Sequence, residues 1–261
     1  RNTGFEFSLS TINIQADDID GFTWSSNLNF AYNNEEIVEL FSGAQDDVGN
    51  EWFIGHPIEV YYDWEKIGIW QLDEEEEAAV YGQRPGEIKV NDINDDGNIT
   101  GDDRVILGQQ QPKWQGGFSN QFSYRNFDLS VMVVGRLGSM IESGVMNGAM
   151  TGRYNDPKSD YWTPDNPTND QPQPRADLEM PVYDDTRNYY DGDFLRLRNV
   201  GLSYNLPVDV VQNILGAQSL RLKVNADNPY VYAPFVQKYN GVDPETGTGN
   251  STPSRWTLNF G

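Results

Sequence analysis

Hydrophobic and polar residues alternate with a period of two along several blocks of this chain. From Phe22 to Tyr32 the even positions are aromatic or aliphatic, apart from Ser26, whereas the odd positions are Thr, Ser, Asn and Ala. Such alternation gives a β-strand one apolar and one polar face. The blocks are about as long as the ~9–11-residue strands of membrane barrels. We therefore predict strands at residues 22–33, 114–125, 127–137, 220–230 and 256–260, and at 5–14 and 194–206, where one change of phase in each predicts a β-bulge.

The connections between these blocks alternate in length. They are short or modest at residues 15–21, 125–126 and 207–219, and long at 34–113, 138–193 and 231–254. Up-and-down outer-membrane barrels have short periplasmic turns and long extracellular loops. A soluble β-sandwich or barrel explains the alternation equally well, but it has no reason to place every long loop at one end. The loop lengths therefore favour an all-β, antiparallel transmembrane barrel that contacts the lipid bilayer.

The charge balance narrows the possible partners. The chain has 40 Asp and Glu against 18 Lys and Arg, a net charge of −22. So acidic a surface repels nucleic acid phosphates, and its counter-charges would be cations such as calcium or basic patches on a partner protein. The absence of cysteine excludes disulfides and thiolate metal sites, and the single histidine, His56, leaves little room for a histidine-based triad or zinc site.

One segment has the spacing of a calcium-binding loop. Asp92, Asn94 and Asp96 occupy positions 1, 3 and 5, Gly97 stands at the turn of position 6, Asn98 offers a carbonyl at position 7, and Asp103 stands at position 12. Alternating oxygen donors let a tight loop wrap one hard cation. We expect Asp92, Asn94, Asp96, Asn98 and Asp103 to bind one structural Ca²⁺ at ~2.3–2.6 Å, within a calcium-loop insertion at residues 86–108 of an extracellular loop. The alternative is a hairpin rich in Asx-turns with a chance acidic run.

Catalysis finds little support in the sequence. Acidic pairs such as Asp184-Asp185 arise by chance among 40 acids and are typical of solvated loops. The glycine-rich runs lack the Lys-Ser/Thr ending of a phosphate-binding loop. Aromatic residues in the long loops could stack on sugars, although packing of the loops is more typical of them. We therefore predict that the protein is not an enzyme.

Seven blocks of the chain form a familiar ordered set, namely residues 69–71, 81–89, the 92–97 loop, 161–169, 193–200, 204–207 and 239–245. Together these blocks resemble the C-terminal part of SusC/RagA-type TonB-dependent outer-membrane transporters. The resemblance spans nearly the whole chain and rests on the order of the blocks.

The resemblance implies a plugged barrel of about 22 strands, of which residues 1–261 supply about seven. The plug domain and earlier strands would lie outside this chain. It also implies a location in the bacterial cell outer membrane, import of oligosaccharides or peptides, a SusD-like surface lipoprotein as a lid, and energy from TonB through an upstream segment. It assigns no substrate-binding residue. The rival interpretation is a secreted calcium-binding β adhesin or carbohydrate-binding module, and a weaker one is a glycan-cleaving enzyme.

The barrel interpretation also predicts an orientation. Residues 34–113, 138–193 and 231–254 would project outward from the cell, and these segments hold most of the acidic excess. A lipoprotein lid would then meet mainly acidic loops, with divalent cations offsetting the repulsion.

Overall fold

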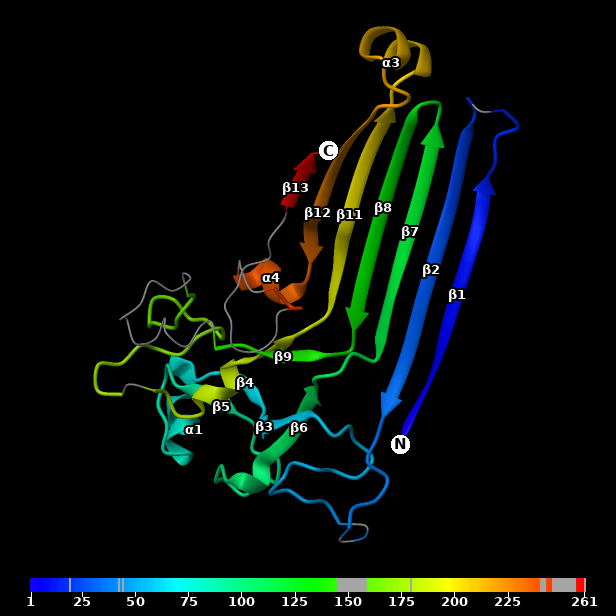
Figure 1. Ribbon diagram of the computed structural model, residues 1–261. Coiled ribbons are helices and arrows are strands. Elements are labelled where there is room, and N and C mark those ends of the chain that lie inside the picture. Colours follow the sequence, from blue (N-terminus) through cyan, green and yellow to red (C-terminus); the bar gives the residue numbers. More distant parts are fainter. Residues whose placement is uncertain are drawn as a thin grey trace.

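The main element of the protein is a single antiparallel sheet of seven strands, ordered β1-β2-β7-β8-β11-β12-β13 (Figure 1). The computed structural model describes residues 1–18, 20–41, 43, 45–144, 159–178, 180–239, 243–245 and 257–260. The predicted strands are all present, except that Trp256 lies outside the described residues. Their bounds are β1 (Asn2–Ile14), β2 (Phe22–Glu35), β7 (Trp114–Tyr124), β8 (Phe127–Leu137), β11 (Phe194–Asn205), β12 (Arg221–Tyr232) and β13 (Thr257–Phe260).

The register of the strands separates apolar from polar side chains. Residues directly opposite one another share a face of the sheet, so the period-2 pattern becomes continuous rows. One apolar row consists of Phe22, Tyr124, Phe127, Tyr204 and Leu222. The next row, one residue along each strand, is polar on every strand and consists of Thr23, Ser123, Asp128, Ser203 and Lys223.

The apolar face is exposed. Phe22, Tyr124 and Phe127 expose 39%, 48% and 50% of their surface, and Tyr230 on β12 exposes 57%. Among the described residues the sheet is a single layer, as Figure 1 shows. A water-soluble sandwich would bury such a face against a second sheet, so the arrangement instead matches a wall between two different environments.

Both predicted bulges are present. The β1–β2 register shifts between Ile12 and Ile14, and β11 shifts between Leu197 and Asn199 against both of its neighbours. Each bulge takes up one extra residue and lets the apolar side chains on both sides of it stay on the same face.

The connections sort by length to opposite ends of the sheet. The two-residue turn 125–126, the connection 15–21 and the turn holding α3 (Val208–Leu215) lie at one end (Figure 1). The described parts of the long connections lie at the other end, including α4 (Pro234–Tyr239). Arg125 takes a left-handed conformation, φ 52°, which closes the tight β7–β8 hairpin. No helix in the described ranges is long and apolar enough to cross a membrane.

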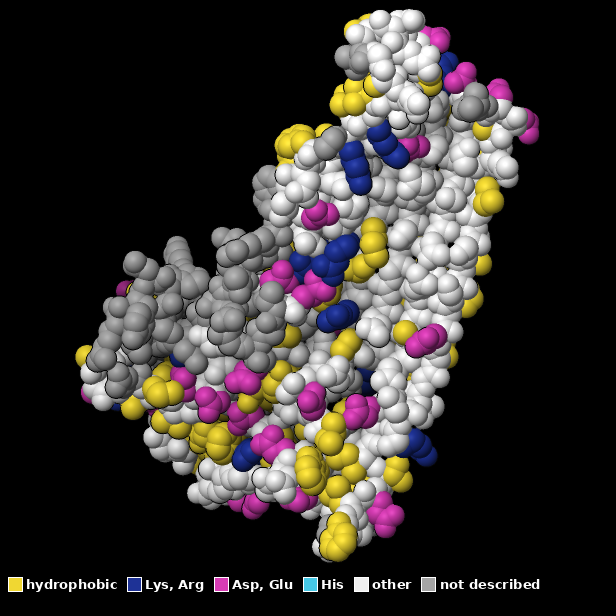
Figure 2. All heavy atoms as spheres, in the orientation of Figure 1, with side chains coloured by type: hydrophobic (Ala, Val, Ile, Leu, Met, Phe, Trp, Pro, Cys, Tyr) yellow, Lys and Arg dark blue, Asp and Glu magenta, His cyan; other side chains and the backbone are white. Residues whose placement is uncertain are grey.

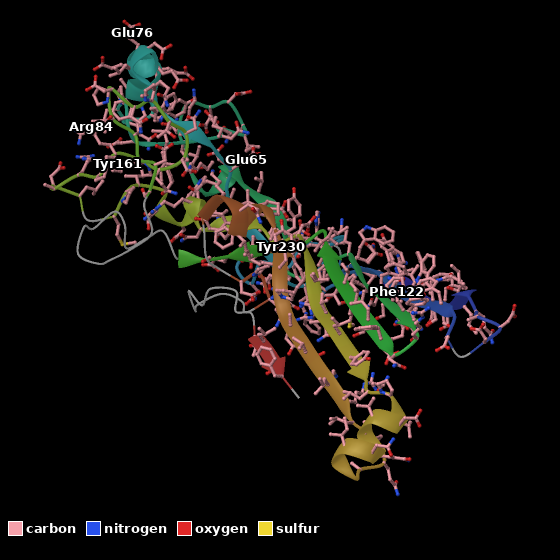
Figure 3. All side chains as sticks on the ribbon, turned by 90° about the horizontal axis from the view of Figure 1, so that it is seen from above. Glu65, Glu76, Arg84, Phe122, Tyr161 and Tyr230 are labelled. Carbon is pink, nitrogen blue, oxygen red and sulfur yellow. The ribbon has the colours of Figure 1, made fainter. Side chains whose placement is uncertain are left out.

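Two of the long connections fold together into a compact loop subdomain. Its core contains Ile69, Ile88, Val90 and Trp162, which are at most 5% exposed. Figure 3 places Glu76, Arg84 and Tyr161 of this subdomain far from Phe122 on the sheet. Its elements are β3 (Val60–Trp64), β4 (Lys66–Ile69), the 3₁₀ turn η1 (Leu72–Glu74), α1 (Glu75–Val80), β5 (Ile88–Val90), η2 (Gly101–Asp103), β6 (Arg104–Gln109), β9 (Met140–Glu142), η4 (Asp184–Arg187) and β10 (Tyr189–Asp191).

Candidate functional site

The polar face of the sheet carries hydrogen-bonded networks that cross several strands. Asp128 on β8 accepts hydrogen bonds from Ser123 Oγ at 2.8 Å and from Arg221 Nη2 at 2.9 Å. Ser8 donates to Asn29 Oδ1 at 2.9 Å across β1 and β2. These side chains form hydrogen bonds with one another and are also accessible to water. The polar face is therefore suited to line a water-filled space.

A trough of about 690 Å³ follows this face near the long-loop end. Its lining mixes amide and charged groups with apolar ones, and it includes Glu6, Asn29, Gln115, Met132, Arg136 and Phe194. Figure 2, which views this face, shows Lys and Arg side chains spaced along a largely uncharged sheet. Such a surface can hydrogen-bond a polar solute without holding it in a closed pocket.

An arginine clasp ties a short acidic segment to the wall. Arg196 on β11 is 2% exposed, and its guanidinium pairs with both carboxylate oxygens of Asp243, with Nη1 3.1 Å from Oδ2. Its Nε lies 2.9 Å from Glu245 Oε2, an electrostatic contact that lacks hydrogen-bond alignment. Arg198 donates to Glu245 Oε1 at 2.6 Å. Asp243 and Glu245 of the 239–245 motif therefore contact Arg196 and Arg198 of the 193–200 motif.

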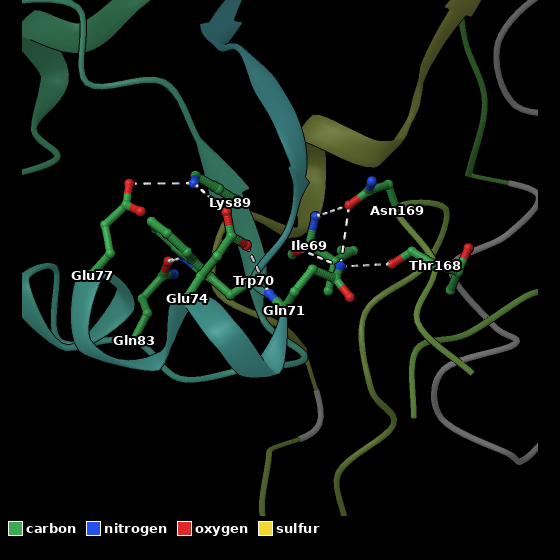
Figure 4. Close-up of polar contacts among 9 residues, drawn as sticks. All are labelled: Ile69, Trp70, Gln71, Glu74, Glu77, Gln83, Lys89, Thr168 and Asn169. Atoms are coloured by element: carbon green, nitrogen blue, oxygen red, sulfur yellow. Dashed lines mark hydrogen bonds and ion pairs between the residues drawn. The ribbon is translucent and has the colours of Figure 1, made fainter. Parts of the chain in front are cut away.

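A hydrogen-bonded core joins the two long loops (Figure 4). The side chain of Gln71 accepts a bond from Trp162 Nε1 at 2.9 Å and donates to Ile69 O at 2.6 Å. Asn169 accepts a bond from the Ile69 amide at 2.9 Å. These contacts join the two loops into one unit at the long-loop end of the sheet.

Charged groups stabilise the outer side of this unit. Lys89 lies 2.8 Å from Glu74 and 3.3 Å from Glu77, and its ammonium stands 4.1 Å from the centre of the Trp70 ring (Figure 4). The hydrogen bond from Lys89 lowers the pKa of Glu74, and the Gln71 amide adds to this effect.

The aromatic residues of the loops pack together, as the sequence indicates. Trp70 and Trp162 are 2% exposed, and Tyr61 contacts the Tyr189 ring at a centroid distance of 5.2 Å. The expectation that Asp184 is solvated is wrong. It is buried beside Arg187, whose Nε donates to it at 2.7 Å.

A partly buried lysine lies where the loop subdomain meets α4. Lys66 Nζ donates to the carbonyl of Asp170 at 2.5 Å. Burial lowers the pKa of Lys66 to about 8, and the positive charges of Lys238 and Arg187 act in the same direction, while Asp170 opposes them.

The predicted calcium loop is closed by its own backbone. Asp92 Oδ2 accepts from the Gly97 amide at 2.9 Å, Asn94 Oδ1 from Asp96 at 2.9 Å, and Asp96 Oδ1 from Asn98 at 2.8 Å. The fully buried Asp103 returns to the start of the loop, where its Oδ1 accepts from the Ile93 amide at 3.1 Å.

The environment of these carboxylates shows how well a cation would fit the loop. The backbone amide of Thr100 is the main cause that lowers the pKa of Asp103, so this carboxylate stays ionised although buried. Asp92 Oδ1 is buried and has no hydrogen-bond donor. However, no three carboxylate, histidine or cysteine side chains gather as a metal-binding group in the part of the chain that the structure describes. A cation here would depend on amide and backbone oxygens as well.

Nothing in the sequence pattern assigns a role to the clasp, to Lys66 or to the hydrogen bonds of Gln71. The one hint in the sequence is the pair Arg196 and Arg198, two residues apart in a predicted strand, because such a spacing places both side chains on the same face of the strand. The acidic partner of each arginine, Asp243 for Arg196 and Glu245 for Arg198, lies 47 residues further along the chain, and no local sequence pattern links them.

Comparisons with known proteins agree on one group. No family model matches the chain. TonB-dependent receptors P26 and P3 of Formosa agariphila are each 31% identical, over 94% and 100% of this chain. TonB-dependent receptor SusC of Bacteroides thetaiotaomicron is 25% identical over 100% of it. The chain spans about a quarter of the length of these curated relatives, 25% to 26%.

Solved structures show the same fold. The RagAB peptide transporter matches 99% of this chain with a TM-score of 0.72 and 24% identity, using 28% of its own chain. The RagAB peptide importer in its open-open state matches the same share with a TM-score of 0.70 and 23% identity.

Proposed function

This chain belongs to the TonB-dependent receptors of the SusC type, which are outer-membrane proteins and not enzymes, and from this membership we propose that it forms part of the barrel wall of a nutrient importer. The importer takes up oligosaccharides or peptides with energy from TonB, which acts through a segment outside these residues. A SusD-like surface lipoprotein works with it above the long loops. The predicted family, location and lack of enzymatic activity are confirmed by the relatives.

One observation carries this proposal: a single continuous sheet with an exposed apolar face and a polar face crossed by hydrogen-bonded side chains. A transmembrane barrel needs an outward apolar band with aromatic residues at both of its edges. Tyr32 and Trp114 pack at a centroid distance of 4.2 Å near the long-loop end, and Phe127 and Tyr204 at 4.6 Å near the short-turn end. The apolar face thus has an aromatic edge at each end, and the polar face would line the lumen of the closed barrel.

Uptake by living cells tests the proposal. Cells with the full-length gene and cells without it are given fluorescent oligosaccharides and fluorescent peptides in parallel. We expect accumulation of one class only when the gene and an energised inner membrane are both present, since TonB transmits that energy. Equal accumulation in both strains, or uptake unaffected by a protonophore, would show that the protein does not perform this import.

We also propose that residues 92–103 hold a structural Ca²⁺. The buried, donor-free Asp92 Oδ1 and the return of Asp103 to the start of the loop support this. Asp92, Asn94, Asp96, Asn98 and Asp103 would supply side-chain and backbone oxygens. The bound ion would fix the loop and add positive charge beside the acidic helix α1.

Calcium titration of the purified transporter tests the metal proposal. The variant Asp96→Ala is expected to lose the binding and to loosen residues 91–103 without unfolding the strands. Asp102→Ala is the matched control, because it removes an exposed acid of the same loop that is not a predicted ligand. Unchanged affinity in Asp96→Ala would refute the assignment.

A further inference from the structure

The first part of the long loop after β2 forms a projection, which we call the acidic tip and define as the described residues 36–41, 43 and 45–59. Its first and last segments are joined by two backbone hydrogen bonds, from the Ile37 amide to His56 O and from the Gly55 amide to Ile37 O, both 2.8 Å. Phe53 is buried and packs on the Tyr62 ring at a centroid distance of 4.6 Å. These contacts hold the base of the acidic tip against the loop subdomain.

Large apolar side chains lie exposed on the acidic tip. Phe41 stands fully exposed in a turn closed by the Gly43 amide, which donates to Leu40 O at 2.9 Å. The positive φ of Gly43, 92°, makes this turn possible. Four more apolar residues of the tip are exposed, namely Val38, Val48, Trp52 and Ile58. A group of exposed apolar side chains on an ordered loop is typical of a protein contact surface.

The charge around these side chains has one sign. The sequence has no Lys or Arg between residues 2 and 65, whereas the tip itself contains six acids, Glu36, Glu39, Asp46, Asp47, Glu51 and Glu59. Within the described residues, Glu36 pairs with Arg1 and Glu51 with Arg104, and the other four have no basic partner. Figure 2 shows apolar and acidic side chains together at this lower end of the molecule.

We propose that the acidic tip is a docking surface for the SusD-like lipoprotein, through an apolar patch on that partner ringed by Lys and Arg. The inference rests on the proposed function, which places the partner above the long loops. Charge complementarity selects this occupant, since basic side chains would neutralise four unpaired carboxylates while the apolar groups are buried. An anionic lipid surface is disfavoured by the same carboxylates.

Photo-crosslinking in the full-length transporter, co-expressed with its lipoprotein, tests the surface. A benzophenone amino acid replaces Phe41 in one sample and Leu72 in the other. Leu72 is a matched control because it is also exposed, at 56%, but lies on the loop subdomain outside the tip. We expect an adduct of the lipoprotein's mass from position 41 only.

Affinity measurements provide the second readout. Phe41→Ser is expected to weaken the complex roughly tenfold or more, as loss of an apolar anchor does. Glu39→Lys should slow association and reduce its salt dependence. Leu72→Ser should leave the affinity and the association rate unchanged. Wild-type affinity in Phe41→Ser, or an adduct with another loop of the same chain, would overturn the docking surface while leaving the partnership intact. Failure of the wild-type proteins to co-purify would overturn the partnership itself.

Discussion

Removing Arg196 should release the acidic segment from the sheet wall. The guanidinium is 2% exposed and faces the buried carboxylate of Asp243 as well as Glu245. In Arg196→Met both acids lose their buried counter-charge, and breaking a buried pair in this way costs about 3–5 kcal/mol. Arg198→Met is the matched control. Arg198 is 35% exposed and also pairs with Glu245, so its loss should cost no more than about 1 kcal/mol.

Hydrogen exchange at the Glu245 amide measures this difference. That amide donates to Asp243 Oδ1 at 3.0 Å, so its protection reports on the clasp. Protection should fall about a hundredfold or more in Arg196→Met, and less than about tenfold in Arg198→Met. Adding Asp243→Asn to Arg196→Met should recover part of the loss, because it removes the buried negative charge that Arg196 faces in the wild-type protein. Equal protection in both single variants would show that burial of Arg196 does not make the clasp strong.

Three further predictions concern the loops. Burial lowers the pKa of Lys66 to about 8, so between pH 8 and 10.5 the unfolded chain binds a proton on Lys66 that the folded loop does not. The free energy of unfolding of the loop subdomain should therefore rise by about 3 kcal/mol across that pH range. Hydrogen exchange at the β4 amides should show this pH dependence, and Lys66→Met should abolish it. Trp162→Ala removes a core side chain that is 2% exposed and should destabilise the subdomain by about 3–5 kcal/mol, seen as faster proteolysis of the loops with an unchanged strand signal in circular dichroism. An epitope near Asn169 should be reachable on intact cells and one inserted between residues 125 and 126 should not, and the reverse pattern would invert the proposed orientation.

The sequence predicted the sheet far better than the loops, for a physical reason. Strand pattern and turn length are local properties, so the phase change near Ile12 and the short turn at Arg125 could be read directly. The contacts of the loop subdomain depend on segments about 90 residues apart, such as Gln71 and Trp162, which share no periodicity. The same limit hid the clasp, where Arg196 is visible in the strand pattern but its partner Asp243 is not.

The calcium loop lies between these two cases. Its spacing is local, and the structure brings Asp103 back to the start of the loop as the twelve-residue pattern requires. Its metal content stays a prediction, because the hydrogen bonds of an Asx-rich turn and the oxygens of a cation site use the same side chains. Only a titration separates the two.

Spin labels on adjacent residues of β2 test the barrel wall most directly. In the full-length transporter in lipid bilayers, with any other cysteines removed, Asn27→Cys and Leu28→Cys place labels on opposite faces of the sheet. If the sheet is a membrane wall, the label at 28 should collide mainly with oxygen, which concentrates in the bilayer, and the label at 27 mainly with a water-soluble nickel chelate. Access of the nickel chelate to both positions, or the inverse pattern, would contradict a membrane wall.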